Sequence, residues 1–229
     1  MGMEIKSETG DLSNHSFGRV SQAYIVAKRI LDIIGAVSGI ILLVPVFLFV
    51  ALLIKLEDPK GPILFYQTRI GKDGKPFRMY KFRSMVSNAE ELLTHLLSKN
   101  EINGLMFKMK EDPRITNIGK FIRRTSIDEL PQLFNVIKGE MSLVGPRPPL
   151  PREVKDYSPY HMNRLKVTPG CTGLWQVSGR NNLDFEQMIE LDIRYIMQRD
   201  FFFRPENYFE NDQTSFRIEG CLLVKGRRI

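Results

Sequence analysis

The longest feature of the hydrophobic pattern is an apolar run over residues 33–54, which carries no formal charge. At about 1.5 Å of rise per residue, a helix of this length matches the roughly 30 Å hydrocarbon core of a bilayer. A polar leader precedes the run, and no small-residue cleavage pattern follows it, so a secretory signal is disfavoured. The pattern predicts a membrane helix rather than a buried core helix.

Charges and a proline decide how such a helix can lie in the bilayer. Lys28 and Arg29 precede the run and Lys55 and Lys60 follow it, so the positive-inside rule selects no orientation. Pro45 lies within the run, where it removes one backbone hydrogen bond and clashes with the preceding turn. Two alternatives remain open on these features: a kinked helix that spans the bilayer, and a helix broken at Pro45 that re-enters on the same side.

Shorter patterns downstream predict a β-hairpin and several helices. Segments ILFYQTRIG (63–71) and PFRMYKFRSM (76–85) are rich in aromatic and β-branched residues and flank a GKDG turn at 71–74. Helix starts are expected at the capping residues Ser87, Thr116, Thr125 or Ser126, and Asp184. The first of these helices is expected to end near Asn100, and the last to bury one apolar face. These elements predict a helix-rich α+β fold with a small hairpin.

Composition narrows the function further. Lys+Arg 33 against Asp+Glu 26 gives a net charge of +7, which favours an anionic partner such as a phosphate or a lipid surface. Two cysteines, Cys171 and Cys221, exclude a disulfide framework, and isolated histidines without a CxxC disfavour zinc. P-loop and Rossmann motifs are absent from the sequence. Aromatics interleave with basic residues in MYKFRSM, but beside a membrane helix we expect no nucleic-acid partner.

The densest group of polar residues lies between positions 121 and 148. Arg123 precedes the adjacent carboxylates Asp128 and Glu129, and Arg147 follows on the stiff loop GPRP. Arginine forks bind phosphate oxygens bidentately, and paired carboxylates can hold Mg²⁺ that also contacts a substrate phosphate. A carboxylate can also attack phosphorus as a nucleophile. The pattern therefore indicates phosphoryl chemistry.

The same residues allow a purely structural alternative. Ser126 and Glu129 form the S-x-x-E pattern of a capping box, and Thr125 and Asp128 have the same spacing. In this interpretation the two carboxylates are favourable charges at a helix N-terminus. There, beside arginines, Asp128 is expected to stay ionised.

Five segments occur in an order that favours the catalytic alternative. They are KRILDII before the apolar run, YKFRSM, DPRITNIGKFIRR, RRTSIDELPQLFNVIKGEMSLVGPRP and VTPGCTGLWQVSGR. Together they resemble the bacterial sugar transferases, the monotopic polyprenyl-phosphate phosphoglycosyl transferases. The resemblance covers roughly residues 27–203.

The resemblance implies a two-step transfer that initiates exopolysaccharide, capsule or other surface glycan synthesis. Asp128 resembles the nucleophile that attacks the β-phosphate of a UDP-sugar, expels UMP and forms a covalent phosphosugar–aspartate. A polyprenyl (undecaprenyl) phosphate then accepts the phosphosugar. Glu129 is similar to the family residue that holds Mg²⁺ or manages the acceptor's proton. Arg123 and Arg147 are expected on phosphates, and Arg180 near the nucleotide. No pattern identifies the sugar.

The resemblance also favours the re-entrant alternative, with the bend at Pro45. It implies a monotopic protein on the cytoplasmic face of the bacterial inner membrane. Its partners would be a UDP-sugar, polyprenyl phosphate and the bilayer, with a homodimer left open. The expected segments are a polar tail (1–23), a re-entrant membrane helix (24–56), a cytosolic catalytic domain (57–203) and an atypical tail (204–229).

The atypical tail has an explanation in the genetic code. Family members continue with a basic, apolar helix similar to DLKIILKTI, whereas this chain reads RPENYFENDQTSF from Arg204. Codons compatible with Arg204 onward, read one base later, encode DLKIILKTIKLVFGSKDAY and a stop. We expect the tail to be out of frame, which the nucleotide sequence of the gene tests. The altered C-terminus also leaves open a second hypothesis: the protein is a catalytically impaired pseudoenzyme or a partner of the glycan assembly machinery.

Overall fold

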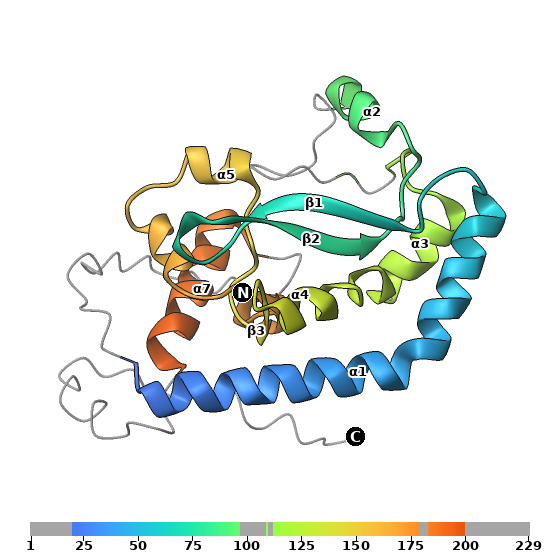
Figure 1. Ribbon diagram of the computed structural model, residues 1–229. Helices are drawn as coiled ribbons and strands as arrows, with labels where there is room; N and C mark the ends of the chain where they lie inside the picture. Colours follow the sequence, from blue (N-terminus) through green and yellow to red (C-terminus); the bar gives the residue numbers. More distant parts are fainter. Residues whose placement is uncertain (1–19, 97–108, 110–111, 179–182, 200–229) are drawn as a thin grey trace, which may run out of the picture.

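A long helix, a β-hairpin and a series of short helices make up the described part of the protein (Figure 1). The computed structural model describes residues 20–96, 109, 112–178 and 183–199. In chain order the elements are α1 (Gln22–Glu57), β1 (Leu64–Ile70), η2 (Lys72–Gly74), β2 (Pro76–Phe82), α2 (Ala89–Leu96), α3 (Asn117–Arg124), η4 (Ile127–Glu129), α4 (Gln132–Lys138), β3 (Ser142–Val144), α5 (Pro151–Lys155), η5 (His161–Lys166), β4 (Gly170–Thr172), α6 (Leu174–Ser178) and α7 (Phe185–Gln198). The helix-rich α+β prediction is confirmed.

Helix α1 contains the whole predicted apolar run and continues through Pro45. Figure 1 shows its second half rising at an angle to the first, which runs along one side of the molecule. The prediction of a helix broken at Pro45 is therefore wrong: the chain bends and stays helical. A proline removes only its own hydrogen bond, and the turns on either side keep theirs.

One side of α1 belongs to the core of the protein. Ala36 packs with Phe77, Met79, Val136 and Met141. A second cluster joins α1 to β2 and α3 through its buried residues Val50, Ile54, Phe82 and Ile122. Because Asp32, Ala36, Val50 and Ile54 are buried against protein in both halves of α1, the helix contributes to the core of the domain.

Polar contacts fasten α1 at both ends. Near its start, the Arg29 guanidinium donates to the carbonyl oxygens of Val136 (2.6 Å) and Ile137 (2.9 Å), in the last turn of α4. At its end, the Glu57 carboxylate accepts hydrogen bonds from the first two backbone N–H groups of α3, at 2.9 and 3.1 Å. Helix termini leave such groups unsatisfied, so these contacts stabilise both short helices.

The predicted hairpin is confirmed. Strands β1 and β2 pair antiparallel, with Leu64 opposite Phe82 and Ile70 opposite Pro76. Asp73 and Gly74 in the turn have φ values of 56° and 75°. That left-handed region suits glycine and short polar residues. Strands β3 and β4 form a separate short parallel pair that no sequence pattern predicted.

Of the four predicted helix starts, two are confirmed, one is displaced and one is wrong. The helix expected from Ser87 begins at Ala89, and Ser87 Oγ donates to Asp58 Oδ2 at 3.2 Å. Thr116 caps α3 by accepting from the Gly119 N–H at 2.9 Å, and Asp184 caps α7. No α-helix begins at Thr125 or Ser126: Ser126 has φ 58°, a 3₁₀ turn follows, and α4 starts at Gln132. The left-handed residue ends α3 and redirects the chain, so the two carboxylates precede α4.

Several predictions fall outside the described residues. These are the helix end near Asn100, the site candidate Arg180, almost all of the N-terminal tail, and the tail at 204–229. They stay predictions.

Candidate active site

Asp128 lies at the centre of the candidate site, on the 3₁₀ turn between α3 and α4. Its side chain is buried, with 6% of the residue exposed, whereas the side chain of Glu129 is 38% exposed. The turn exists because Ser126 adopts a left-handed conformation, which is uncommon for a non-glycine residue. Strained backbone of this kind persists where surrounding structure holds it, often at active sites.

The capping-box alternative is wrong. Within the described part of the chain, the Ser126 side chain makes no capping hydrogen bond. Glu129 is occupied elsewhere, because its Oε1 accepts from Lys81 Nζ at 2.6 Å. Thr125 Oγ1 donates back to the Phe121 carbonyl oxygen at 3.0 Å. The carboxylates therefore face the hairpin, and no helix terminus accounts for them.

Lys81 is a site residue that the sequence analysis missed. It lies on β2 and pairs with Glu129, and its charge also acts on Asp128. A signal was present: Lys81 shares a strand face with the buried residues Phe77 and Met79, since side chains alternate along a strand. A lysine on a buried strand face requires a partner, and the carboxylate pair supplies it.

Arg123 lies in the last turn of α3, close enough to Asp128 for each charge to affect the pKa of the other group. Its Nε donates to Ser84 Oγ at 2.8 Å, immediately after β2. The charges of Asp112 and Arg114, which form a buried bidentate pair (2.9 and 2.6 Å), also act on Arg123. Burial lowers the pKa of Arg123, and Asp128 opposes this shift. The assignment of Arg123 to phosphate binding stays a prediction.

Burial controls the charge of Asp128. It raises the pKa of the carboxyl above its usual value, Lys81 and Arg123 act to lower that pKa, and Glu129 adds to the increase. The expectation that Asp128 stays ionised assumed a residue at a helix N-terminus and did not include burial. Helix α4 instead starts later in the chain, at Gln132. A carboxylate with a raised pKa is a stronger base and nucleophile.

Arg147 lies on the proline-rich loop after β3. Its charge and that of Glu129 both act on a third residue, Arg69. Arg147 Nη1 is 3.9 Å from Glu153 Oε1. Arg69 lies close enough to both Arg147 and Glu129 for their charges to affect its pKa, which burial lowers to about 9. The site thus has basic groups on several sides of Asp128 and Glu129.

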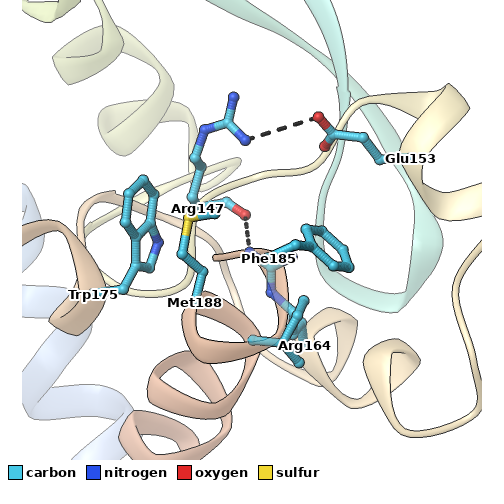
Figure 2. A pocket seen from close by; sticks show the side chains of 7 residues that line it. Arg147, Glu153, Arg164, Trp175, Phe185 and Met188 are labelled. Carbon is cyan, nitrogen blue, oxygen red and sulfur yellow. Dashed lines mark hydrogen bonds and ion pairs between the residues drawn. The ribbon is translucent and has the colours of Figure 1, made fainter. Parts of the chain in front are cut away.

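A pocket opens beside Arg147. It is lined by Arg147, Glu153, Arg164, Trp175, Phe185, Met188 and Ile189. Figure 2 shows the Arg147 guanidinium directed toward Glu153, with Trp175 to its left and Met188 below it.

The residues suit a partial magnesium site. Among the residues that the structure describes, no group of three or more acidic, histidine or cysteine side chains could hold a metal by itself. Mg²⁺ is commonly bound through one or two carboxylates together with substrate phosphates. Asp128 and Glu129 match that donor set, with Glu129 the more accessible of the two.

Comparison with known proteins identifies the class. The sequence model of the bacterial sugar transferases matches residues 23–207, so the chain belongs to the bacterial sugar transferase family.

Particular relatives are similar over the same region. The galactosyl transferase CpsE of Streptococcus agalactiae is 51% identical over 175 residues, which are 76% of this chain and 38% of that protein. The undecaprenyl-phosphate galactose phosphotransferase of Salmonella typhimurium is 46% identical over 74% of this chain and 36% of its own length. The exopolysaccharide production protein ExoY of Rhizobium meliloti is 38% identical, and the match covers 77% of this chain and 80% of that protein. The chain thus spans less than half of the first two relatives.

Proposed function

We propose that this protein transfers a sugar 1-phosphate from a UDP-sugar to polyprenyl phosphate through a covalent intermediate on Asp128. One observation carries the proposal: the buried carboxylate of Asp128, next to the Lys81–Glu129 ion pair, lies within the region that matches the bacterial sugar transferase model. The names of the relatives, a galactosyl transferase and an undecaprenyl-phosphate galactose phosphotransferase, support this substrate class.

The first step forms a bond from a carboxylate oxygen of Asp128 to the β-phosphorus of the donor. The bond between that phosphorus and the bridging oxygen breaks, and UMP leaves with the electron pair. In the second step an oxygen of polyprenyl phosphate attacks the same phosphorus, which frees the Asp128 carboxylate. Arg123 and Arg147 would stabilise charge on the phosphoryl oxygens in both steps.

Glu129 and Lys81 form an ion pair next to the proposed nucleophile Asp128. Lys81 Nζ holds Glu129 Oε1 at 2.6 Å and keeps a positive charge beside the nucleophile. Glu129 and Asp128 would hold Mg²⁺, which when bound neutralises charge on the donor diphosphate.

The exposed side of α1 supports a monotopic arrangement on the membrane surface. Of the helices in the described residues, α1 alone has the length and hydropathy to cross a bilayer. Its large exposed side chains are Ile25, Val26, Ile30, Leu31, Ile33, Ile34, Val37, Ile41, Leu42, Val44, Leu48, Phe49, Leu52 and Leu56. A spanning helix outside a bundle would present its whole circumference to lipid, whereas α1 packs one side on its own domain. We therefore place this face in the cytoplasmic leaflet, with both ends of α1 in the cytoplasm.

Replacing Pro45 with leucine is expected to favour a spanning topology, because it restores the missing helical hydrogen bond and straightens α1. The measurement is labelling of single cysteines at Val26 and Lys60 by an impermeant reagent, with Cys171 and Cys221 replaced by alanine. In the unmodified helix both sites should react from the cytoplasmic side alone. If the two sites of the unmodified helix react from opposite sides, the monotopic arrangement is refuted. Opposite-side reaction in Pro45→Leu alone is the expected effect of the substitution.

Incubation with a panel of UDP-sugars, undecaprenyl phosphate and Mg²⁺ tests the proposed function, with release of UMP as the signal. We expect one donor to be preferred and a lipid-linked diphosphate sugar to accumulate. If the purified, folded protein releases UMP from no donor, the pseudoenzyme alternative replaces the proposal.

Replacing Lys81 with methionine is expected to move the acidic limb of the pH–rate profile to higher pH. Lys81 lowers the pKa of Asp128, so its loss raises that pKa and leaves less of the ionised nucleophile. We expect UMP release to fall by about tenfold on the acidic limb of the profile, and by less at alkaline pH, where Asp128 is ionised in both proteins.

Lys81→Arg is the matched control, because it retains the charge on the same strand face. A uniform loss of activity across the pH range in Lys81→Met, with no movement of the acidic limb, would contradict the electrostatic role.

A further inference from the structure

The loop that carries Arg147 is stiff but has few backbone donors with which to fasten itself to the rest of the domain. Its sequence, GPRPPLP at 145–151, contains four prolines, which have no backbone N–H to donate. Three consecutive carbonyl oxygens of this loop instead accept hydrogen bonds from outside it. Arg164 Nη2 donates to the Arg147 oxygen (3.2 Å), Arg69 Nη1 to the Pro148 oxygen (3.0 Å), and the Ile70 N–H to the Pro149 oxygen (3.0 Å).

The first of these donors is itself fixed. Arg164 Nε and Nη2 both donate to Asp192 Oδ2, at 2.9 and 2.6 Å, and Nη1 donates to the Tyr157 hydroxyl at 2.6 Å. Asp192 is fully buried and Arg164 is 7% exposed. A buried charged pair of this kind is costly to form, and more so here because Asp192 Oδ1 has no hydrogen-bond partner among the described residues. A guanidinium bound on three sides, however, has one orientation. That orientation directs Nη2 at the Arg147 carbonyl (Figure 2).

Asp192 does not follow from the apolar pattern of α7. It lies on the helix face that buries Met188, Ile189, Ile193 and Ile196, where the periodicity predicts a hydrophobic residue. Packing alone would be served at least as well by leucine at this position, because an apolar replacement of a buried ion pair is often neutral or stabilising. The ion pair therefore requires a reason beyond packing.

We propose that Arg164 and Asp192 are positioning residues that hold the Arg147 loop so that its guanidinium meets the donor's phosphates. The inference rests on the proposed function for its substrate, but its structural part does not. Asp192 orients Arg164, and Arg164 fixes the backbone of Arg147. Donor binding thus depends on a pair that contacts no substrate.

A neighbouring ion pair provides the matched control. His161 Nε2 and Glu186 Oε2 are 3.1 Å apart and also join η5 to α7, but neither side chain contacts the Arg147 loop by a described hydrogen bond. A general brace between the two elements would be weakened by Glu186→Gln as well as by Asp192→Asn. If the Arg164–Asp192 pair acts specifically on the Arg147 loop, only Asp192→Asn releases the loop, and Glu186→Gln has no effect on it.

The kinetic test is a double-mutant cycle in the full-length protein. We expect Arg164→Met and Asp192→Asn to raise the KM for the UDP-sugar by about tenfold or more, with a smaller change in kcat. In an Arg147→Met background, adding Arg164→Met should raise the KM little further, because the clamp acts through Arg147. Fully additive effects, or an equal effect of Glu186→Gln, would overturn the proposal.

A second readout does not need activity. Trp175 is the chain's single tryptophan, and it lines the same pocket as Arg147 and Arg164. Release of the loop should increase quenching of its fluorescence by acrylamide in Arg164→Met and in the milder Asp192→Asn, but not in Glu186→Gln. If no donor yields UMP yet this pattern appears, the proposed function fails and the clamp stands. Unchanged quenching in both variants, each folded by its thermal transition, would refute the clamp.

Discussion

Replacing Asp128 with asparagine is expected to abolish UMP release, a fall of about 10³-fold or more. The amide is nearly the same size as the carboxylate, so the buried turn should keep its shape. It has no anionic oxygen to attack phosphorus, and it cannot form the acyl phosphate. The decisive measurement is intact mass: the wild type incubated with donor alone should gain the mass of a phosphosugar, and Asp128→Asn should not.

Two further variants are compared with Asp128→Asn: a substitution of the neighbouring carboxylate and a control on the protein surface. Glu129→Gln should leave at most a trace of activity, because it removes the partner of Lys81 and the more accessible metal ligand. Asp73→Asn is the matched control, since Asp73 lies on the exposed hairpin turn, where asparagine also tolerates a positive φ. It should behave as the wild type. Substantial UMP release by Asp128→Asn would sink the nucleophile assignment.

Replacing Asn135 with leucine is expected to destabilise the protein by about 3 kcal/mol and to lower its Tm by about 10 °C. Asn135 is fully buried in α4 and joins this helix to β2. Its Oδ1 accepts from the Tyr80 N–H at 3.0 Å, and its Nδ2 donates to the Arg78 carbonyl oxygen at 2.7 Å. Leucine fills the space but removes the side-chain partner of both partly buried backbone groups. Thermal unfolding in a fixed lipid nanodisc measures the loss.

Asn163→Leu is the control for this prediction. Asn163 donates one hydrogen bond to the Tyr160 carbonyl, three residues away, and joins no two elements. Its replacement should cost less than about 1 kcal/mol. Equal losses of Tm in the two variants would show that the contacts of Asn135 with β2 add no stability beyond a local turn.

The parts of the fold that local patterns specify were predictable. The hairpin follows from alternation and the GKDG turn, and α7 from its cap and its apolar face. The grouping of Arg123 with Asp128 and Glu129 also followed from the sequence, because one turn of chain separates them. The signature segment, however, mixes roles: Asp128 belongs to the site, whereas Asn135 holds the scaffold.

The remaining features depend on partners far away in the chain. Ser126 takes a left-handed conformation that no local propensity favours, so the turn at 127–129 could not be distinguished from a helix start. Arg69 reaches the Arg147 loop across a sequence separation of 79 residues. Such contacts follow from the tertiary fold, and periodicity carries no information about them. The buried Asp192 is the exception, since a charge on an apolar helix face signals a partner.

The fastening of α1 at both ends has a mechanical consequence. Arg29 holds the end of α4 and Glu57 holds the start of α3, and the turn bearing Asp128 is the short segment between these two helices. Helix α1, which we propose to lie in the membrane surface, therefore acts as a brace across the segment that carries Asp128. A force that straightens or bends this helix moves its attachment points. Bilayer thickness and micelle curvature exert such forces. Turnover numbers for this protein are thus comparable only between preparations that share one hydrophobic environment.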